Sequence, residues 1–199
     1  MRTLYLARHG EADGDLTPAG RQQSRLLGER LAGRPIAALH HSPVARAAQT
    51  AALVAESLPD VAVRPSDLIS DHPPFLPAAE DLPPVFAPIA LRHLADYTEE
   101  QRATGPALAA GALATFATPT EEDRAELLVT HSQMVTWFLR AALDAAPWRW
   151  LGNNAANAAL TIIQYRPGWP ASVITFNDQS HLPPELRWTG FPAERSAAW

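Results

Sequence analysis

An arginine and a histidine follow an apolar run close to the start of the chain. The run covers residues 4–7 and ends in Arg8, His9 and Gly10. Its composition predicts a buried β-strand, and a glycine at its end permits a sharp turn. Ligands of open α/β sheets bind at the carboxyl ends of the strands. A fixed cation beside an imidazole at such an end favours an anion held next to a nucleophile or a base, and phosphate is the first candidate.

A second apolar run ends in the same way. Residues 127–130 predict another buried strand, which places His131 at its carboxyl end and just before a helix. The free N–H groups and the partial positive charge of a helix N-terminus suit an anion. Two histidines at two strand ends therefore predict one shared site.

Arg46 stands in the first turn of a helix that Ser42 and Pro43 are expected to open. A cation at this end of a helix opposes the helix dipole, at a cost of about 0.3–1 kcal/mol. One interpretation is a solvated surface arginine. The other is that Arg46 faces the crevice and offers its planar guanidinium to phosphate oxygens, forming a clamp with Arg8.

Strand and helix signals alternate through the first third of the chain. Thr17 followed by Pro18 predicts the start of a helix that runs to about residue 31. Short apolar segments at 36–40 and 61–63 predict two further strands, separated by a second helix that ends at about residue 58. This βαβαβ pattern favours a mainly parallel sheet with helices on its faces.

The middle of the chain is rich in proline. Residues 65–88 predict an ordered excursion or lid, with Phe75, Leu76 and Phe86 as apolar anchors. The elements expected after it are helices at about 85–95 and 99–117, a helix at 133–143 capped by Ser132, and paired strands at 159–165 and 172–176.

Composition sets the outer limits. A chain of 199 residues with 47% hydrophobic residues fits one globular domain over residues 1–199. The net charge of −5 and the lack of a basic run argue against nucleic acid as a partner. No apolar run approaches the roughly 18 residues that cross a bilayer. Because the first strand leaves no room for a signal peptide, we expect a cytoplasmic protein without a membrane partner.

Four motifs in order resemble those of the histidine phosphatase superfamily, the clan of cofactor-dependent phosphoglycerate mutase and many phosphomonoester hydrolases. They are residues 8–11 (Arg-His-Gly-Glu), 16–21 (Leu-Thr-Pro-Ala-Gly-Arg), 42–51 (from Ser42-Pro43 to Ala51) and 129–131 (Val-Thr-His). The resemblance implies a phosphoglycerate mutase-like fold, which is a three-layer α/β/α sandwich with a mainly parallel central sheet.

The resemblance also implies roles. His9 matches the nucleophile that becomes phosphorylated, Arg8 and Arg46 match the phosphate-binding arginines, and His131 matches the second histidine. Ser132 replaces a glycine that is usual after this histidine, so we expect a phosphate contact from its backbone N–H and its hydroxyl. No metal and no cofactor is expected.

The proton donor departs from the family pattern. Asp71 stands where the family commonly has the glutamate of Leu-x-Glu, and Asp67, Glu80 and His72 are the alternatives. A further interpretation is that Asp71 only caps a turn before the prolines. The stretch 13–15 (Asp-Gly-Asp) replaces an asparagine of the mutases, and we expect this loop to face away from the phosphate or to meet a cationic part of the substrate.

These residues predict a metal-independent phosphatase that hydrolyses a phosphomonoester through a phosphohistidine on His9. The substrate is a small metabolite or a phosphoprotein, and a looser similarity of 69–77 and 150–165 to a protein-phosphatase branch points to the latter. The alternatives are a phosphoglycerate mutase-type transferase and a phosphate-binding module with weak or no turnover. The chain has no lysine, which counts against holding a bisphosphate. The oligomeric state stays open.

Overall fold

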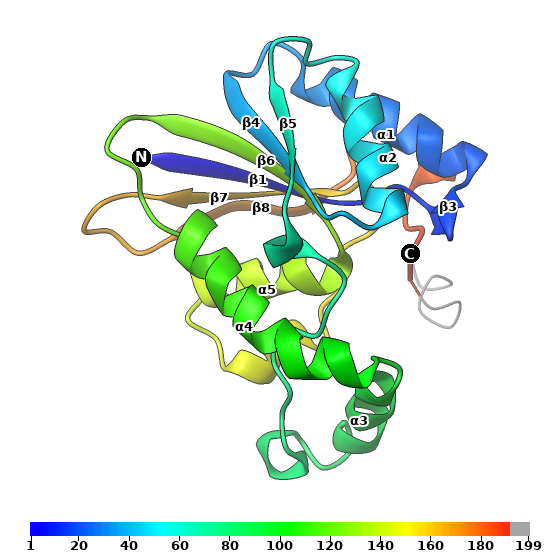
Figure 1. Ribbon diagram of the computed structural model, residues 1–199, viewed down its shortest axis with the longest axis vertical. Coiled ribbons are helices and arrows are strands. Elements are labelled where there is room, and N and C mark those ends of the chain that lie inside the picture. Colours follow the sequence, from blue (N-terminus) through cyan, green and yellow to red (C-terminus); the bar gives the residue numbers. More distant parts are fainter. Residues whose placement is uncertain (192–199) are drawn as a thin grey trace.

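A six-stranded sheet with helices on both faces forms the centre of the protein (Figure 1). The computed structural model describes residues 1–191, so residues 192–199 of the expected domain lie outside the described part. The sheet order is β5-β4-β6-β1-β7-β8, with β7 antiparallel to both of its neighbours and the other pairs parallel. The predicted α/β/α sandwich with a mainly parallel sheet is confirmed.

The elements of the sheet and its helices follow the predicted order. The strands of the sheet are β1 (Arg2–Arg8), β4 (Ile36–His41), β5 (Ala62–Pro65), β6 (Arg124–Thr130), β7 (Leu160–Tyr165) and β8 (Ser172–Asp178). The helices are α1 (Pro18–Leu31), α2 (Ala45–Ala55), α3 (Ala87–Ala95), α4 (Glu99–Phe116) and α5 (Ser132–Ala142). A tight hairpin of β2 (Ala12–Asp13) and β3 (Asp15–Leu16), which the sequence analysis does not predict, precedes α1.

The central strands are buried on both sides because their side chains alternate between two cores. Leu4, Leu6 and Leu128 pack with residues of α3, α4 and α5. Ala7 and Val129 pack on the opposite face with residues of α1 and α2. Strands covered on both faces are apolar throughout, which explains why these segments lack the polar alternation of a surface strand.

The predicted helix starts agree only in part with the structure. Thr17 caps α1 as expected, accepting a hydrogen bond from the Gly20 N–H at 3.0 Å. The start of α2 is corrected: the N-cap residue is Val44, because the Ser42 hydroxyl accepts from the Val44 N–H at 3.2 Å and closes a turn before the helix. In α5 the N-cap position belongs to His131, and Ser132 is the first helical residue.

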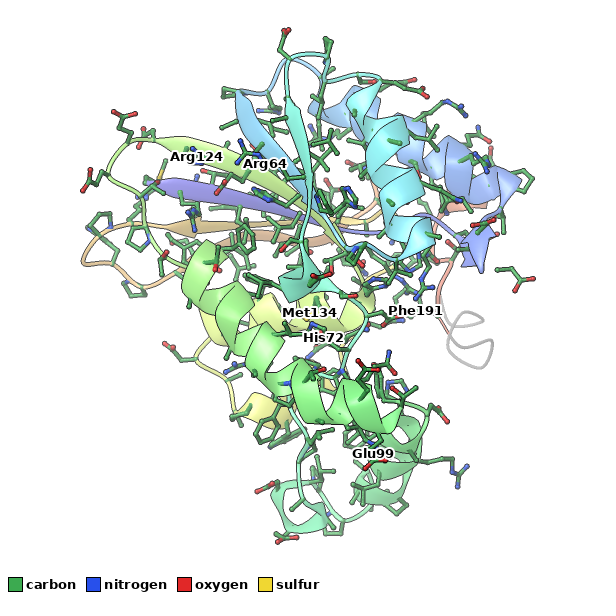
Figure 2. The ribbon with its side chains drawn as sticks, viewed as in Figure 1. Arg64, His72, Glu99, Arg124, Met134 and Phe191 are labelled. Carbon is green, nitrogen blue, oxygen red and sulfur yellow. The ribbon has the colours of Figure 1, made fainter. Side chains whose placement is uncertain are left out.

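The proline-rich excursion contains two short 3-10 helices, η1 (Asp67–Ile69) and η2 (Ala79–Asp81). Phe75 and Phe86 pack against the core as predicted, whereas Leu76 is exposed. His72, which Figure 2 labels, is buried beside Gly105 of α4. The excursion therefore follows the surface of the α4–α5 layer, and α3 lies at its far end, away from the sheet (Figure 1).

Three strands end side by side and bring their following residues together. Arg8 of β1 pairs with Thr130 of β6, and His41 of β4 pairs with Val129. The residues that follow these strand ends consequently meet at one edge of the sheet. In the part of the chain that the structure describes, no helix is both long and apolar enough to cross a membrane.

Candidate active site

His9 follows β1 and has its ring fixed from both sides. Its Nδ1 lies 2.7 Å from the carbonyl oxygen of Gly10, and its Nε2 lies 3.1 Å from Nε of Arg46. A carbonyl only accepts hydrogen bonds and a guanidinium only donates them. The imidazole therefore carries its proton on Nδ1 and keeps a lone pair on Nε2.

Gly10 has a different role from the predicted sharp turn. Its backbone has no positive φ, but a Cβ there would lie 2.4 Å from the carbonyl oxygen of Gly20. The glycine is required because the loop after His9 runs directly against α1.

The environment of His9 keeps the imidazole neutral. The side chain is buried, and burial is the largest cause that lowers its pKa to about 2, followed by the neighbouring His131 and Arg8. Positive charge and low polarity both disfavour the imidazolium. A lone pair on Nε2 is therefore available at neutral pH.

His131 follows β6 and faces His9, with their ring centroids 5.2 Å apart in an edge-to-face arrangement. Its Nε2 shares a hydrogen bond of 2.9 Å with the Ser42 hydroxyl. Its Nδ1 is buried without a hydrogen-bond partner and lies 3.7 Å from a carboxylate oxygen of Asp71. Burial, then Arg46 and Arg8, holds the pKa of His131 well below its usual value. A bound anion would act in the opposite direction.

Two guanidinium groups reach this edge of the sheet from different elements. Arg8 donates from Nη1 to the carbonyl oxygens of Ala155 and Gly190, each at 2.9 Å. Burial lowers the pKa of Arg8 to about 10, so the group stays charged at neutral pH. Arg46 projects from the first turn of α2 and pairs with the carboxylate of Asp71. The surface interpretation of Arg46 is excluded by these contacts.

Asp71 is fixed by three different elements. One carboxylate oxygen accepts from Arg46, the other accepts from the side-chain amide of Gln133, and its backbone carbonyl accepts from Gln101 at 2.8 Å. Its side chain remains 30% exposed, so it is open toward the site. The carboxylate thus faces His131 and Arg46 rather than capping a turn.

A cavity of about 240 Å³, here called the histidine pocket, connects these groups. Its lining contains all six residues singled out from the sequence, together with three others: Arg8, His9, Ala12, Gly14, Arg46, Asp71, His131, Ser132 and Gln133. Asp67 and Glu80 are exposed and His72 is buried, and none of these three lines the histidine pocket.

Ser132 and the β2–β3 hairpin both border the histidine pocket, but with different groups. The Ser132 hydroxyl donates to Asn154 and accepts from the Ala155 N–H at 3.0 Å, so its proton is already committed. The hairpin brings Gly14 to the rim of the histidine pocket, while Asp15 accepts from Gln49 at 2.8 Å. This loop therefore borders the site with backbone rather than with carboxylates.

Several residues of the site are absent from the sequence-based prediction. Gln133 lines the histidine pocket and holds Asp71, and its only signal is its place two residues after His131. Ser42 bonds His131, although the sequence indicates only a helix cap. Gly190 bonds Arg8 from the far end of the chain, and no local pattern predicts this contact.

The charges that face the histidine pocket are two guanidiniums and one carboxylate, which leave a net positive charge for an anion. Within residues 1–191, no group of three or more His, Asp or Glu side chains is arranged to hold a metal ion. The strand order and the paired histidines define an α/β protein of phosphoglycerate mutase-like fold.

Comparisons with known proteins agree with this class. A model of the histidine phosphatase superfamily (branch 1) matches residues 4–71. The serine/threonine-protein phosphatase Pgam5 of Caenorhabditis elegans is 34% identical over 196 residues, which cover 92% of this chain and 65% of that protein. By these matches the chain is similar to members of the histidine phosphatase superfamily.

Solved structures with less than 25% identity share the fold. Bacillus stearothermophilus YhfR has a TM-score of 0.69 and 24% identity, over 91% of this chain and 99% of that chain. Phosphoserine phosphatase of Entamoeba histolytica, in complex with 3-phosphoglyceric acid, has a TM-score of 0.68 and 20% identity, over 92% and 100% of the two chains.

The expected cytoplasmic location is overturned by the curated relatives, which are named mitochondrial proteins. The chain spans slightly less than two thirds of the length of the first of them. The expectation rested on the position of the first strand, which does not determine the compartment.

Proposed function

We propose that this chain is a metal-independent phosphatase that hydrolyses a phosphomonoester through a phosphohistidine on His9. The observation that carries the proposal is the neutral imidazole of His9, with the lone pair of Nε2 directed at Arg46 in a cationic pocket. Phosphoryl transfer needs positioning and neutralisation of oxygen charge more than it needs covalent chemistry from the protein. The phosphatase names of the curated relatives support the same reaction class.

In the first step, the Nε2 lone pair of His9 attacks phosphorus in line with the leaving oxygen. A nitrogen–phosphorus bond forms and the phosphorus–oxygen bond to the alcohol breaks. Asp71 donates a proton to the leaving oxygen, as an alkoxide is a poor leaving group. Arg8, Arg46 and His131 face the phosphoryl oxygens and stabilise their negative charge.

In the second step, water attacks the phosphohistidine and gives its proton to the Asp71 carboxylate. The nitrogen–phosphorus bond breaks, inorganic phosphate leaves, and His9 recovers its lone pair. The two steps return Asp71 to its protonated form and consume one water.

The substrate must displace an existing contact, because Arg46 already pairs with Asp71. Phosphoryl oxygens that take over the guanidinium release the Asp71 carboxyl group from this contact and leave it free to face the leaving oxygen. Substrate binding in this way prepares the proton donor. The same exchange is unavailable to Asp67 and Glu80, which lie outside the histidine pocket.

Hydrolysis is favoured over mutase chemistry by the distribution of charge. Arg8 and Arg46 are the only basic side chains besides histidine that line the two cavities at this edge within the described residues. A bisphosphate would need a second set of cations. The names of the relatives point to a phosphoprotein as one substrate class, with a small phosphorylated metabolite as the other.

Trapping of the phosphoenzyme tests the proposal. Rapid quenching with a labelled phosphomonoester should give acid-labile, base-stable phosphate on the wild-type protein and none on His9→Ala. His41→Gln is the matched control, since its Nδ1 also bonds the next carbonyl, that of Ser42 at 2.9 Å, outside the histidine pocket. Labelled phosphate retained by His9→Ala contradicts the assignment. Binding of phosphate without any release of product supports the binding module instead.

A further inference from the structure

A second, larger cavity opens beside the histidine pocket. It has a volume of about 440 Å³ and shares Arg8, Ser132 and Gln133 with the histidine pocket. Cavities of 300–1,000 Å³ are typical of sites for small molecules. A group bonded to a phosphoryl oxygen in the histidine pocket therefore reaches this cavity, here called the apolar pocket, without leaving the protein.

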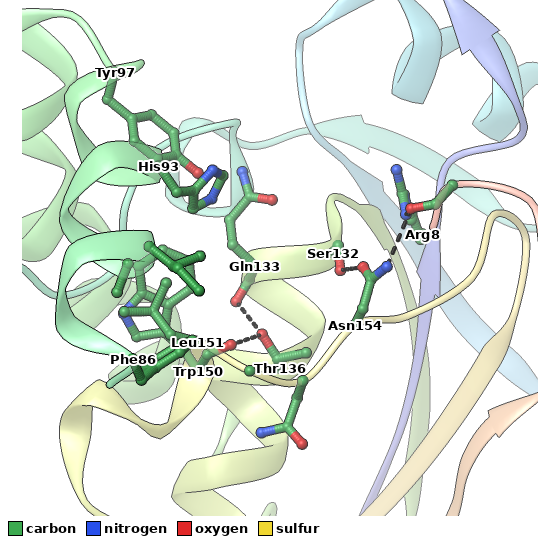
Figure 3. A pocket seen from close by; sticks show the side chains of 15 residues that line it. Arg8, Phe86, His93, Tyr97, Ser132, Gln133, Thr136, Trp150, Leu151 and Asn154 are labelled. Carbon is green, nitrogen blue, oxygen red and sulfur yellow. Dashed lines mark hydrogen bonds between the residues drawn. The ribbon is translucent and has the colours of Figure 1, made fainter. Parts of the chain in front are cut away.

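The wall of the apolar pocket opposite Arg8 is aromatic. The ring of His93 lies 5.7 Å from that of Tyr97 and 6.4 Å from that of Trp150. Figure 3 shows these three rings and Phe86 on the side away from Arg8. Segments far apart in the chain, the end of the proline-rich excursion with α3 and the region after α5, build this wall together.

The opposite wall is polar and belongs to the phosphoryl end. Ser132 and Asn154 lie next to Arg8 in Figure 3, and Gln133 lies between the two walls. The polarity of the lining thus changes across the apolar pocket. Hydrogen-bonding groups lie at the end next to the expected phosphate, and aromatic side chains lie at the other end. A substrate with one polar and one apolar end matches this order.

The charges in the lining restrict the occupant further. Among the described residues that line the apolar pocket, Arg8 alone is permanently charged, and no carboxylate is present. The Nη1 of Arg8 is already bonded to the carbonyls of Ala155 and Gly190. A carboxylate or an ammonium group on the far wall would lose its hydration without gaining an ionic partner.

We propose that the apolar pocket binds the alcohol part of the substrate and selects uncharged aromatic or branched aliphatic leaving groups over acids and polyols. The inference rests on the proposed phosphatase function and names its substrate class. An aromatic ring that enters the pocket gains both area burial and ring contacts with the aromatic wall. This gain in binding free energy does not depend on which acid protonates the leaving oxygen.

Binding of two phosphonates tests the apolar pocket without any turnover. Calorimetry should show that 2-phenylethylphosphonate binds the wild-type protein about 10-fold more tightly than 2-carboxyethylphosphonate, as one hydrophobic group is worth this much in a fitted pocket. Hydrolysis should follow the same order, with a higher kcat/KM for 2-phenylethyl phosphate than for glycerol 3-phosphate. Equal binding of the two phosphonates, or binding of neither, overturns the inference.

Two aliphatic residues beside the apolar pocket provide a matched pair of variants. Ile89 lines it, whereas Val85 does not and is 89% exposed. Ile89→Ala should weaken 2-phenylethylphosphonate about 5-fold and leave 2-carboxyethylphosphonate unchanged, and Val85→Ala should alter neither. Ile89→Lys should move the preference toward the carboxylate. Equal effects of Ile89→Ala on both compounds contradict the proposal.

The failure of the two proposals can be told apart. If no phosphomonoester is hydrolysed while the phenyl preference in binding persists, the phosphatase function is wrong and the apolar pocket stands. If esters are hydrolysed at equal kcat/KM regardless of the alcohol, the phosphatase function stands and the selectivity is wrong.

Discussion

The guanidinium of Arg46 donates from Nε to Nε2 of His9 at 3.1 Å while its Nη2 pairs with the carboxylate of Asp71. One side chain thus connects the expected nucleophile with the expected proton donor. Because Arg46 lies in the first turn of α2, a helix held against the sheet by buried residues, its position follows from the fold and not from a flexible loop. A phosphoryl group that takes over this guanidinium displaces its pairing with Asp71.

Asp71→Asn should slow the hydrolysis of alkyl phosphates by about 10²–10⁴-fold, the usual contribution of general acid catalysis. The loss on p-nitrophenyl phosphate should be far smaller, because that leaving group needs little protonation. Steady-state kinetics on both substrates measure the difference. Asp67→Asn is the control, as this exposed carboxylate lies outside the histidine pocket. Equal losses on the two substrates would assign the proton transfer to another group.

Gln133→Leu should reduce kcat for alkyl phosphates and change the rate with p-nitrophenyl phosphate far less. The amide of Gln133 donates to the Asp71 carboxylate, so its loss removes one of the two side-chain contacts that position the expected proton donor. Gln133→Glu should have the same effect, because an ionised carboxylate cannot donate this hydrogen bond. Steady-state kinetics of the three proteins on both substrates provide the measurement, and equal losses on the two substrates in both variants would show that Gln133 does not act through Asp71.

Gly190→Ala should weaken the binding of inorganic phosphate about 10-fold, equivalent to roughly 1.4 kcal/mol. Gly190 has a φ of +82°, and a Cβ there would lie 2.4 Å from Nη1 of Arg8, so this guanidinium must move. Gly168→Ala is the matched control, since Gly168 has a φ of +73° with no atom within 4 Å of a Cβ. Both variants carry backbone strain at a positive φ, but only Gly190→Ala also displaces side chains, and calorimetric titration with phosphate should separate them. Identical phosphate affinities would rule out a role of Gly190 in placing Arg8.

The free energy of unfolding should fall as the pH is lowered below about 6.5. Burial lowers the pKa of His9 in the folded protein to about 2, so between these values the unfolded chain takes up a proton that the folded chain does not. The contribution of His9 to the free energy of unfolding is complete above pH 6.5. It decreases by about 1.4 kcal/mol for each pH unit below about pH 6. Urea unfolding at several pH values measures this free energy for the wild type and for His9→Asn. It should depend less steeply on pH in the variant. Parallel curves would mean that His9 is protonated in the folded state.

Much of the site follows from local patterns. Arg8 and His131 come after apolar runs, and parallel strands that pair in register end at the same edge of a sheet. The Thr17-Pro18 start of α1 is likewise a local signal, because a cap and its helix are neighbours in sequence. The start of α2 was misplaced because a serine hydroxyl can close a turn as well as cap a helix.

The apolar pocket and the residues that orient the charges lay beyond any local pattern. Gln133 meets Asp71 across 62 positions of sequence, and Gly190 meets Arg8 across 182. The aromatic wall likewise combines His93 of α3 with Trp150, which follows α5. Such contacts depend on the packing of one layer on another, for which a single sequence contains no spacing signal.

Local patterns suffice to place Arg8, His9 and His131 at one edge of the sheet, since strand ends and helix starts are local properties of the chain. The tertiary structure alone decided the state of those groups: the lone pair on His9 Nε2, the pairing of Arg46 with Asp71, and the apolar pocket beside them. The reason is physical, because protonation and selectivity depend on burial and on distances between side chains that only the packed fold sets.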